Sequence, residues 1–265
     1  MTNESAFASA LASARSSGTP MARPVSEWLP STVQDACRMQ SRVVAHLGAI
    51  AAWKVSAISA RGQIALGVDR PIAAPVPGQW TLDSPATLRL DRFLHPLLEC
   101  EFAFEIGADL PARDAPYTRV EVEAAIAALR IAIEVCDSRL PSGSPVLAQL
   151  VDGFNNGALV LGPRHVDWRG VDYAHHRMTL RHDDGGGTGP RELATGDGRP
   201  ILDGDPVGAV VLMANLQPQL YGGLRRGQVV TTGTCTGAVR VPGPGDFEAD
   251  FGSLGSVRLR CELED

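Results

Sequence analysis

The sequence predicts an α+β protein in which a β-rich core is decorated with helices. Short apolar segments separated by glycine and proline turns occupy the last part of the chain, at 229–233, 237–241 and 256–262. Segments with helical spacing are few, and they do not alternate with the strands as βαβ units would. A chain of 265 residues can bury a substantial core, either as one large domain or as one domain with an extension.

The N-terminal part of the chain is expected to be helical. Within the first 30 residues, Ala8, Leu11 and Ala12 share one helical face, and a loosely ordered segment is the alternative. The pair Ser31-Thr32 is a predicted cap for a second helix that ends near Leu47. A strand is then expected around the sequence Trp-Lys-Val at 53–55.

Later elements are predicted from their end signals. Thr118 and Glu121 form a capping box, and Val122, Ile126 and Leu129 follow at helical spacing, so the helix is expected to run directly into the next strand. The glycine-rich segment 183–199 is predicted to be a flexible loop. A further helix is expected at 206–222, kinked or split by Pro218.

Three glutamates occur in otherwise apolar segments that are expected to form buried strands. Glu99 and Glu101 belong to LLECEFAFEIG, and Glu134 belongs to RIAIEVCDSRL. A carboxylate loses solvation in such a segment, so it must be neutral, paired or bound to a cation. Residues two apart on a strand point to the same face, about 7 Å apart. The three carboxylates can therefore converge on one oxygen-only site, which suits Mg²⁺ or Mn²⁺ better than zinc. The alternative is a half-exposed edge strand whose glutamates are in water.

The composition restricts the class of function. The formal net charge is −6 and no basic run occurs, so binding to nucleic acid is not expected. No stretch of about 20 apolar residues is present, so no membrane span is expected. The N-terminus has no basic region before its mildly apolar stretch, which argues against a signal peptide. The five cysteines are widely spaced and form no CxxC pair, which indicates free thiols in a reducing compartment and predicts a cytoplasmic protein.

Six segments of the chain, taken in order, resemble the fumarylacetoacetate hydrolase superfamily. They are AWKVSAIS, GVDRP, LECEFAFEIGADLP, AIEVCDSRL, NNGALVLG and DFGSLGSVRLRCE. The similarity extends over roughly residues 33–262 and is closest to the branch of 2-hydroxypenta-2,4-dienoate (2-keto-4-pentenoate) hydratases and 4-oxalocrotonate decarboxylases.

The resemblance implies a mixed β-roll or barrel core with peripheral helices. We assign residues 1–48 to a helical N-terminal segment and residues 49–265 to the catalytic domain. The resemblance also implies a homo-oligomer, a Mg²⁺ or Mn²⁺ ion held by Glu99, Glu101 and Glu134, and short 2-oxo or 2-hydroxy-dienoic acids from aromatic ring cleavage as substrates. In hydratases of this branch, the dienol is protonated at C5 and water then adds at C4.

Lys54 matches the lysine of the family, and the resemblance gives it a catalytic role in polarising the substrate or relaying a proton. A nearby divalent cation would push the pKa of this ammonium down. The alternative is a surface lysine whose stem packs on apolar groups. Five residues match small or polar pocket positions of the family and are expected to bind substrate, with turn or cap roles as the alternative: Ser59, Gln63, Asn155, Asn156 and Thr234.

The sequence also departs from the family at three places. Ile72 replaces the acid that follows the GVDxP motif, and Ile58 replaces a pocket threonine. The Asp-Asn pair before the NNG strand is Asp152-Gly153 here, with Phe154 after it. These changes make the site drier and remove groups that handle protons. His95 is the one alternative base that the sequence offers.

Three functions therefore remain open. A hydratase, which is a carbon–oxygen lyase, is the first expectation because it is the closest resemblance. A decarboxylase of 4-oxalocrotonate-like acids needs only a metal-stabilised enolate sink, and an apolar pocket disfavours the charged carboxylate that it loses. The third possibility is a diverged homologue that binds a metal and an oxo acid without turnover.

Overall fold

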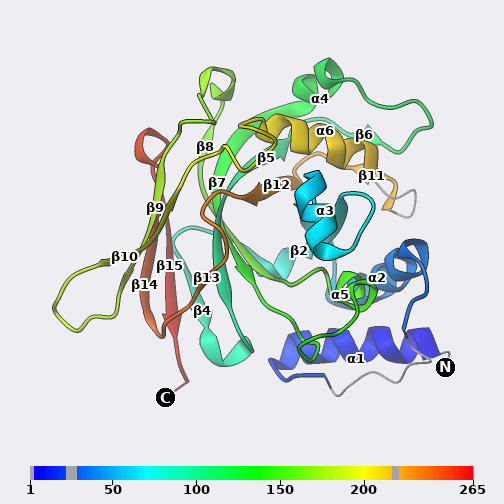
Figure 1. The fold of residues 1–265 in the computed structure, drawn as a ribbon, viewed down its shortest axis with the longest axis horizontal. Coiled ribbons are helices and arrows are strands. Elements are labelled where there is room, and N and C mark those ends of the chain that lie inside the picture. Colours follow the sequence, from blue (N-terminus) through cyan, green and yellow to red (C-terminus); the bar gives the residue numbers. More distant parts are fainter. Residues whose placement is uncertain (1–2, 22–28, 217–220, 265) are drawn as a thin grey trace.

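The computed structural model describes residues 3–21, 29–216 and 221–264, and its centre is a strongly curled sheet of eight strands (Figure 1). The strands are ordered β2-β1-β12-β5-β7-β8-β3, and β13 pairs with β5 outside this path. Their bounds are β1 Ile50–Ser56, β2 Ile72–Pro77, β3 Thr81–Asp83, β5 Leu97–Ile106, β7 Ile126–Cys136, β8 Asn156–His165, β12 Val229–Thr234 and β13 Val239–Arg240.

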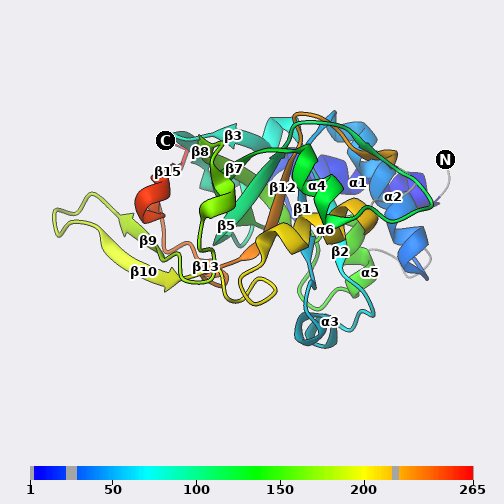
Figure 2. The ribbon, with the colours of Figure 1, turned by 90° about the horizontal axis from the view of Figure 1, so that it is seen from above.

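A second sheet of five strands, ordered β10-β9-β14-β15-β4, packs against the curled sheet. Its strands are β4 Ala86–Arg89, β9 Met178–Asp183, β10 Arg191–Gly196, β14 Gly245–Asp250 and β15 Ser256–Glu262. The β9–β10 hairpin extends away from the body, at the end opposite the N-terminal helices (Figure 2). A small two-stranded sheet joins β6 Leu110–Pro111 to β11 Gly223–Leu224.

In the described part of the chain, six α-helices lie around the sheets. They are α1 Asn3–Ser17, α2 Val33–Leu47, α3 Ala60–Leu66, α4 Arg119–Ala125, α5 Val146–Val151 and α6 Pro206–Leu216. Helices α1, α2 and α5 gather at one end of the curled sheet, and α3 lies beside its open side (Figure 1). Within the described residues, no helix combines the length and the apolar character needed to cross a bilayer. The predicted α+β class with a β-rich core is confirmed.

The two faces of β5 differ, and this difference creates the interior of the curl. Phe102 and Phe104 point to the main apolar core, whereas Glu99, Glu101 and Ala103 alternate with them on the opposite face. The inner face is otherwise built from a separate apolar cluster rich in small side chains: Ala52, Val76, Ala103, Ala132, Leu159, Leu161 and Val229. Small inner side chains let the sheet curl tightly while leaving room for the carboxylates.

The N-terminal helices form a second apolar cluster that reaches the curled sheet. Phe7 and Leu11 of α1 and Met39 of α2 are fully or almost fully buried in it, together with Ile72 of β2 and Phe154. The expected apolar face of the first helix and the expected Thr32 cap are confirmed, the latter because the Thr32 side chain accepts a hydrogen bond from the Asp35 backbone N–H. The division of the chain at residue 48 stays a prediction.

The structure corrects two expectations about local elements and adds a strand that was not predicted. Helix α4 begins at the predicted capping box but ends at Ala125, so Ile126 and Leu129 belong to β7 instead. Pairing of β7 with both β5 and β8 outweighs the helical spacing. The segment 183–199 is not a loop throughout, because 191–196 form β10, and only the glycines at 185–189 lie in the connection between β9 and β10. Strand β14 was not predicted, since only Phe247 and Ala249 of its residues are buried. The expected kink at Pro218 lies outside the described residues.

The capping box of α4 predicts a pH-dependent contribution to stability. Hydrogen bonds from the Thr118 backbone and side chain, with Arg113 nearby, lower the pKa of Glu121 from 4.5 to about 2. A carboxylate with a lowered pKa stabilises the fold above its ordinary pKa and loses that contribution as the pH falls through its folded pKa. Glu121→Gln should therefore lower the melting temperature at pH 7, and the difference from wild type should shrink between about pH 4.5 and about pH 2. Thermal unfolding followed by circular dichroism tests this. A difference that is constant over that pH range would mean that the charge contributes nothing.

Candidate metal centre and active site

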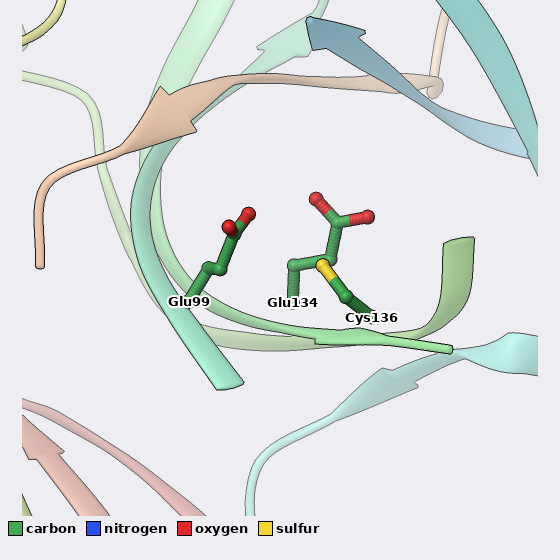
Figure 3. Close-up of side chains that lie close together, drawn as sticks. All are labelled: Glu99, Glu134 and Cys136. Carbon is green, nitrogen blue, oxygen red and sulfur yellow. The ribbon is translucent and has the colours of Figure 1, made fainter. Parts of the chain in front are cut away.

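The three predicted glutamates project from one face of two paired strands. Strands β5 and β7 are antiparallel neighbours, and Glu99 lies directly opposite Glu134 in their ladder. Glu101 lies opposite Ala132 on the same face. The side chains of Glu99 and Glu134 point into the hollow of the curled sheet (Figure 3). Glu101 and Glu134 are buried, at 1% and 0% exposure, so the alternative of water-exposed glutamates on an edge strand is wrong for these two.

Lys54 of β1 reaches across the hollow to Glu134. Its Nζ lies 2.9 Å from Glu134 Oε1, and the two side chains are 7% and 1% exposed. The same ammonium donates to the backbone carbonyl of Phe154 at 3.2 Å. Strands β1 and β7 are not neighbours, because β12 and β5 lie between them in the sheet. The curl of the sheet is therefore what brings the two charges together, and the alternative of a surface lysine is wrong.

The two carboxylate oxygens of Glu134 have different surroundings. Oε1 accepts from Lys54 and, at 3.4 Å, from Asn156 Nδ2. Oε2 is buried and, among the described residues, has no hydrogen-bond partner. A buried acceptor without a partner costs about 1–3 kcal/mol. Such an oxygen, in a hollow that also receives two further carboxylates, fits a bound cation.

The cluster also contains a thiol. One ligand atom each from Glu99, Glu134 and Cys136 lie within 4.8 Å of one another (Figure 3). Glu101 is not part of this group of three, and its Oε2 accepts from the backbone N–H of Gly233 at 2.9 Å. The donors facing the hollow are thus carboxylate oxygens with one sulfur beside them. The carboxylates suit a hard divalent cation.

Burial and mutual repulsion dominate the electrostatics of the cluster. Burial raises the pKa of Glu99, against the opposing effect of the Lys54 ammonium. Burial, followed by the charges of Glu134 and Glu99, raises the pKa of Glu101 well above its usual range. Burial by itself would lower the pKa of Lys54, but the charge of Glu134 leads a set of acidic neighbours that outweigh burial and raise it. The lysine is therefore an ammonium, whereas a bound divalent cation would act in the opposite direction.

The backbone around Phe154 is held in an unusual conformation. Gly153, Phe154 and Asn155 have φ angles of 75°, 51° and 63°, so three consecutive residues are in the left-handed region. This conformation is costly for Phe154, whereas asparagine adopts it more readily than most residues with a side chain. It directs the Phe154 carbonyl to Lys54, and it lets the Asn155 carbonyl accept from the Asp137 N–H at 2.7 Å.

A buried ion pair supports this strained segment. Arg139 Nε lies 2.9 Å from Asp152 Oδ1, and the two side chains are 4% and 3% exposed. Arg139 also donates to the backbone carbonyls of Asp137, Asp152 and Asn156. One guanidinium therefore fixes both ends of the segment that carries Phe154.

The remaining predicted pocket residues fall into two groups. Thr234 lies opposite Glu101 in the β12–β5 pairing, and its Oγ1 is buried without a partner among the described residues. Ser59 is exposed and caps α3, accepting from the Gly62 N–H, while Gln63 Nε2 donates to the Ala57 carbonyl. The hydrogen bonds of Ser59 and Gln63 are thus local to α3, and their role in substrate binding stays a prediction.

A cavity of about 560 Å³ adjoins the cluster. Leu97 and Cys136, which are cross-strand partners on the face that carries the glutamates, both line it. Asn155 and His95 line it as well. The cavity therefore meets the cluster at Cys136, on the face of the sheet that carries the glutamates.

Two features of the site were not predicted. The period of two places Cys136 on the same side of the strand as Glu134, as expected, but the approach of its thiol to the carboxylates of Glu99 and Glu134 was not anticipated. The contacts made by the Phe154 carbonyl and the Gly233 N–H have no signal in the sequence, since every residue carries these groups and only the fold directs them.

Comparison with known proteins identifies the family. No family model matches the chain. The 2-keto-4-pentenoate hydratase of Paraburkholderia xenovorans is 30% identical over 262 residues, which cover 96% of this chain and 93% of the relative. A 4-oxalocrotonate decarboxylase from a Pseudomonas species is 25% identical over 238 residues, covering 88% and 84%.

Solved structures agree with the sequence relatives. The 4-oxalocrotonate decarboxylase from Pseudomonas putida G7, complexed with magnesium and adipate, matches with a TM-score of 0.84 and 21% identity over 98% of this chain and 97% of that chain. A fumarylacetoacetate hydrolase family protein from Yersinia pestis matches with a TM-score of 0.55 and 18% identity over 80% and 92%. The fold is that of the fumarylacetoacetate hydrolase superfamily. Within it, the chain belongs to the branch of 2-keto-4-pentenoate hydratases and 4-oxalocrotonate decarboxylases, which confirms the resemblance.

The ion pair across the hollow predicts a stability effect. Lys54→Met leaves Glu134 buried without its partner, and the free energy of unfolding of the metal-free protein should fall by about 3 kcal/mol. Urea unfolding in EDTA measures the loss. The matched control is Lys54→Met combined with Glu134→Gln, which removes both charges and should recover most of the stability. Equal losses in the single and the double variant would show that packing of the lysine stem, and not charge pairing, accounts for the effect.

Proposed function

We propose that this protein is a divalent-metal-dependent hydratase, a carbon–oxygen lyase, that acts on short 2-hydroxy-dienoic or 2-oxo-enoic acids. The observation that carries the proposal is the buried Lys54–Glu134 pair, which faces Glu99 and Glu101 in one hollow beside a cavity. A charged donor beside a set of carboxylates suits a reaction in which negative charge develops on a bound oxo acid.

Glu99, Glu101 and Glu134 would hold the cation, which we propose to be Mg²⁺ or Mn²⁺. Two observations support this assignment: Glu134 Oε2 has no hydrogen-bond partner among the described residues, and burial, together with repulsion between the carboxylates, raises the pKa values of Glu99 and Glu101. Structures of the Pseudomonas putida decarboxylase are complexes with magnesium in one case and calcium in another. When bound, the cation would polarise the carboxylate and the 2-oxygen of the substrate and offset the developing enolate charge.

Lys54 would donate to the substrate. An ammonium has three N–H donors, and two of those of Lys54 are directed to Glu134 and to the Phe154 carbonyl. The third is available to a group bound in the hollow. As an ammonium it can stabilise the 2-oxygen, and a bound cation, which would lower its pKa, would favour delivery of a proton to the dienol.

Substrate contacts would come from the polar groups around the hollow. Asn155 lines the cavity, and Thr234 presents a buried hydroxyl opposite Glu101. Asn156 is buried against Glu134, so we assign it to orienting that carboxylate in addition to the substrate contact expected from the family. Ser59 and Gln63 would contribute from α3.

Decarboxylation is the second candidate, and the two isoleucines favour it. Ile72 is 4% exposed and belongs to the apolar cluster of the N-terminal helices, and Ile58 approaches Gly233, whose N–H binds Glu101. Neither position offers a group that could activate water. Loss of CO₂ needs only a metal-stabilised enolate. A diverged homologue that binds an oxo acid without turnover needs neither activated water nor the enolate.

An ultraviolet assay separates these functions. The purified protein is given 2-hydroxypenta-2,4-dienoate or 4-oxalocrotonate, with Mg²⁺ and then with EDTA. Metal-dependent loss of the dienol absorbance with a 4-hydroxy-2-oxo product by NMR supports the hydratase. Release of CO₂ from 4-oxalocrotonate alone supports the decarboxylase. Turnover of neither substrate by a protein that binds metal would contradict both and favour the binding homologue.

A ligand substitution tests the metal assignment. Glu101→Gln keeps the shape of the side chain but removes a ligand charge, so metal-dependent activity should fall by about a hundredfold or more. Stability without metal should change little, because burial and repulsion already disfavour the charged form of Glu101. Glu105→Gln is the control, since Glu105 is on the same strand but pairs with Arg164 at 2.9 Å. Unchanged activity of Glu101→Gln would remove this residue from the metal site.

Assembly and location are also proposals. We expect a homo-oligomer, as the resemblance implies, and a cytoplasmic location, as the spacing of the cysteines indicates. Sedimentation analysis of the purified protein would measure the oligomer size.

A further inference from the structure

Helix α1 contributes one buried arginine that contacts Asn156, the neighbour of Glu134. Arg15, in the last turn of α1, is 9% exposed. It donates to the Asn156 carbonyl at 2.8 Å, to Asn156 Oδ1 at 2.7 Å and to the Gly157 carbonyl at 2.8 Å. The guanidinium carbon lies 4.3 Å from the centre of the Trp80 ring. Arg15 and Asn156 are 141 residues apart in the sequence, so the fold alone creates this contact.

These hydrogen bonds fix which way the amide of Asn156 points. A guanidinium only donates, so the atom of Asn156 that it meets must be the oxygen. The amide nitrogen is then directed to Glu134 Oε1, at 3.4 Å. If the amide were reversed, its oxygen would face the carboxylate and repel it.

The orientation of Glu134 follows from the amide. Oε1 is held from two sides, by Asn156 and by Lys54 at 2.9 Å. Because Oε1 is held in this way, Oε2 is left buried and without a partner among the described residues. This is the oxygen that a cation in the cluster would use.

We propose that Arg15 is a positioning residue for Glu134 and acts through Asn156. Helix α1 would then supply a residue that orients a ligand of the metal centre. The proposal rests on the proposed function in one respect, which is that Glu134 is a metal ligand. The alternative is that Arg15 only anchors α1 to the curled sheet through its carbonyl contacts and Trp80. An anchor would affect stability, whereas a positioning residue also affects metal affinity and does so only through Asn156.

A double-mutant cycle on metal binding distinguishes the two roles. Mn²⁺ affinity is measured by calorimetry for the full-length wild type, Arg15→Met, Asn156→Ala and the double variant, with thermal stability recorded for each. Groups that orient a metal ligand typically contribute 10–100-fold in affinity, so each single variant should bind about tenfold more weakly. If Arg15 acts through Asn156, the double variant should bind no more weakly than the single variants. The proposal would be overturned if the loss of Mn²⁺ affinity in the double variant equalled the product of the two single losses. Full affinity in Arg15→Met would overturn it as well.

Arg42→Met is the matched control for helix anchoring. Arg42 of α2 holds α1 through Glu4, at 2.6 Å, and no contact between Arg42 and Asn156 is present among the described residues. This variant should lose stability while its Mn²⁺ affinity stays within twofold of wild type. A weakening equal to that of Arg15→Met would mean that docking of the helix, and not the hydrogen bond to Asn156, controls the site. If Arg15→Met does not fold, Arg15→Lys takes its place in the cycle, because lysine keeps the charge but not the fork of donors.

The outcomes separate this inference from the proposed reaction. Mn²⁺ binding by a wild type that turns over neither substrate would contradict the proposed reaction, and the cycle would still decide the role of Arg15. Turnover together with independent effects in the cycle would contradict the inference alone. Absence of Mn²⁺ binding by the wild type would overturn both.

Discussion

The ion pair between Lys54 and Glu134 is the interaction on which the site depends. A pair buried this deeply is not retained for stability alone, because desolvation of the two charges can exceed their attraction. Its effect here is chemical. It keeps the lysine charged among several acids, and it occupies Oε1 of Glu134, while Oε2 has no hydrogen-bond partner among the described residues.

The pair exists only because the sheet is curled. Four small or β-branched side chains, at Ala52, Ala103, Ala132 and Val229, belong to the apolar cluster on the inner face. The opposite face of β5 carries Phe102 and Phe104, which the core covers. Small side chains on the inner face and large ones on the outer face together favour curvature of the sheet. This curvature brings β1 opposite β7.

Several supports act on the same few atoms of the site. The left-handed segment at 153–155 directs a carbonyl to Lys54, and the Arg139–Asp152 pair holds that segment in place. Asn156 follows the segment, and its backbone carbonyl accepts hydrogen bonds from both Arg139 and Arg15. Two buried guanidinium groups thus converge where β8 begins, and they offset the backbone strain of the residues before it. The apolar cluster around Ile72 and Phe154 closes this region from the side of the helices.

Much of this protein was determined by its sequence alone. The period of two on a strand places Glu99 and Glu101 on one face, and capping signals mark where α2 and α4 begin, because these are properties of short segments. The order of six motifs indicated the family. The end of α4 could not be predicted from these local signals, because the pairing of β7 with β5 and β8 determines it.

Only the tertiary structure decided that Lys54 contacts Glu134, that the Phe154 carbonyl accepts from Lys54 and that Arg15 donates to Asn156. These contacts join segments up to 141 residues apart, and their geometry follows from how the sheet curls and how the N-terminal helices pack on it, which no local pattern encodes.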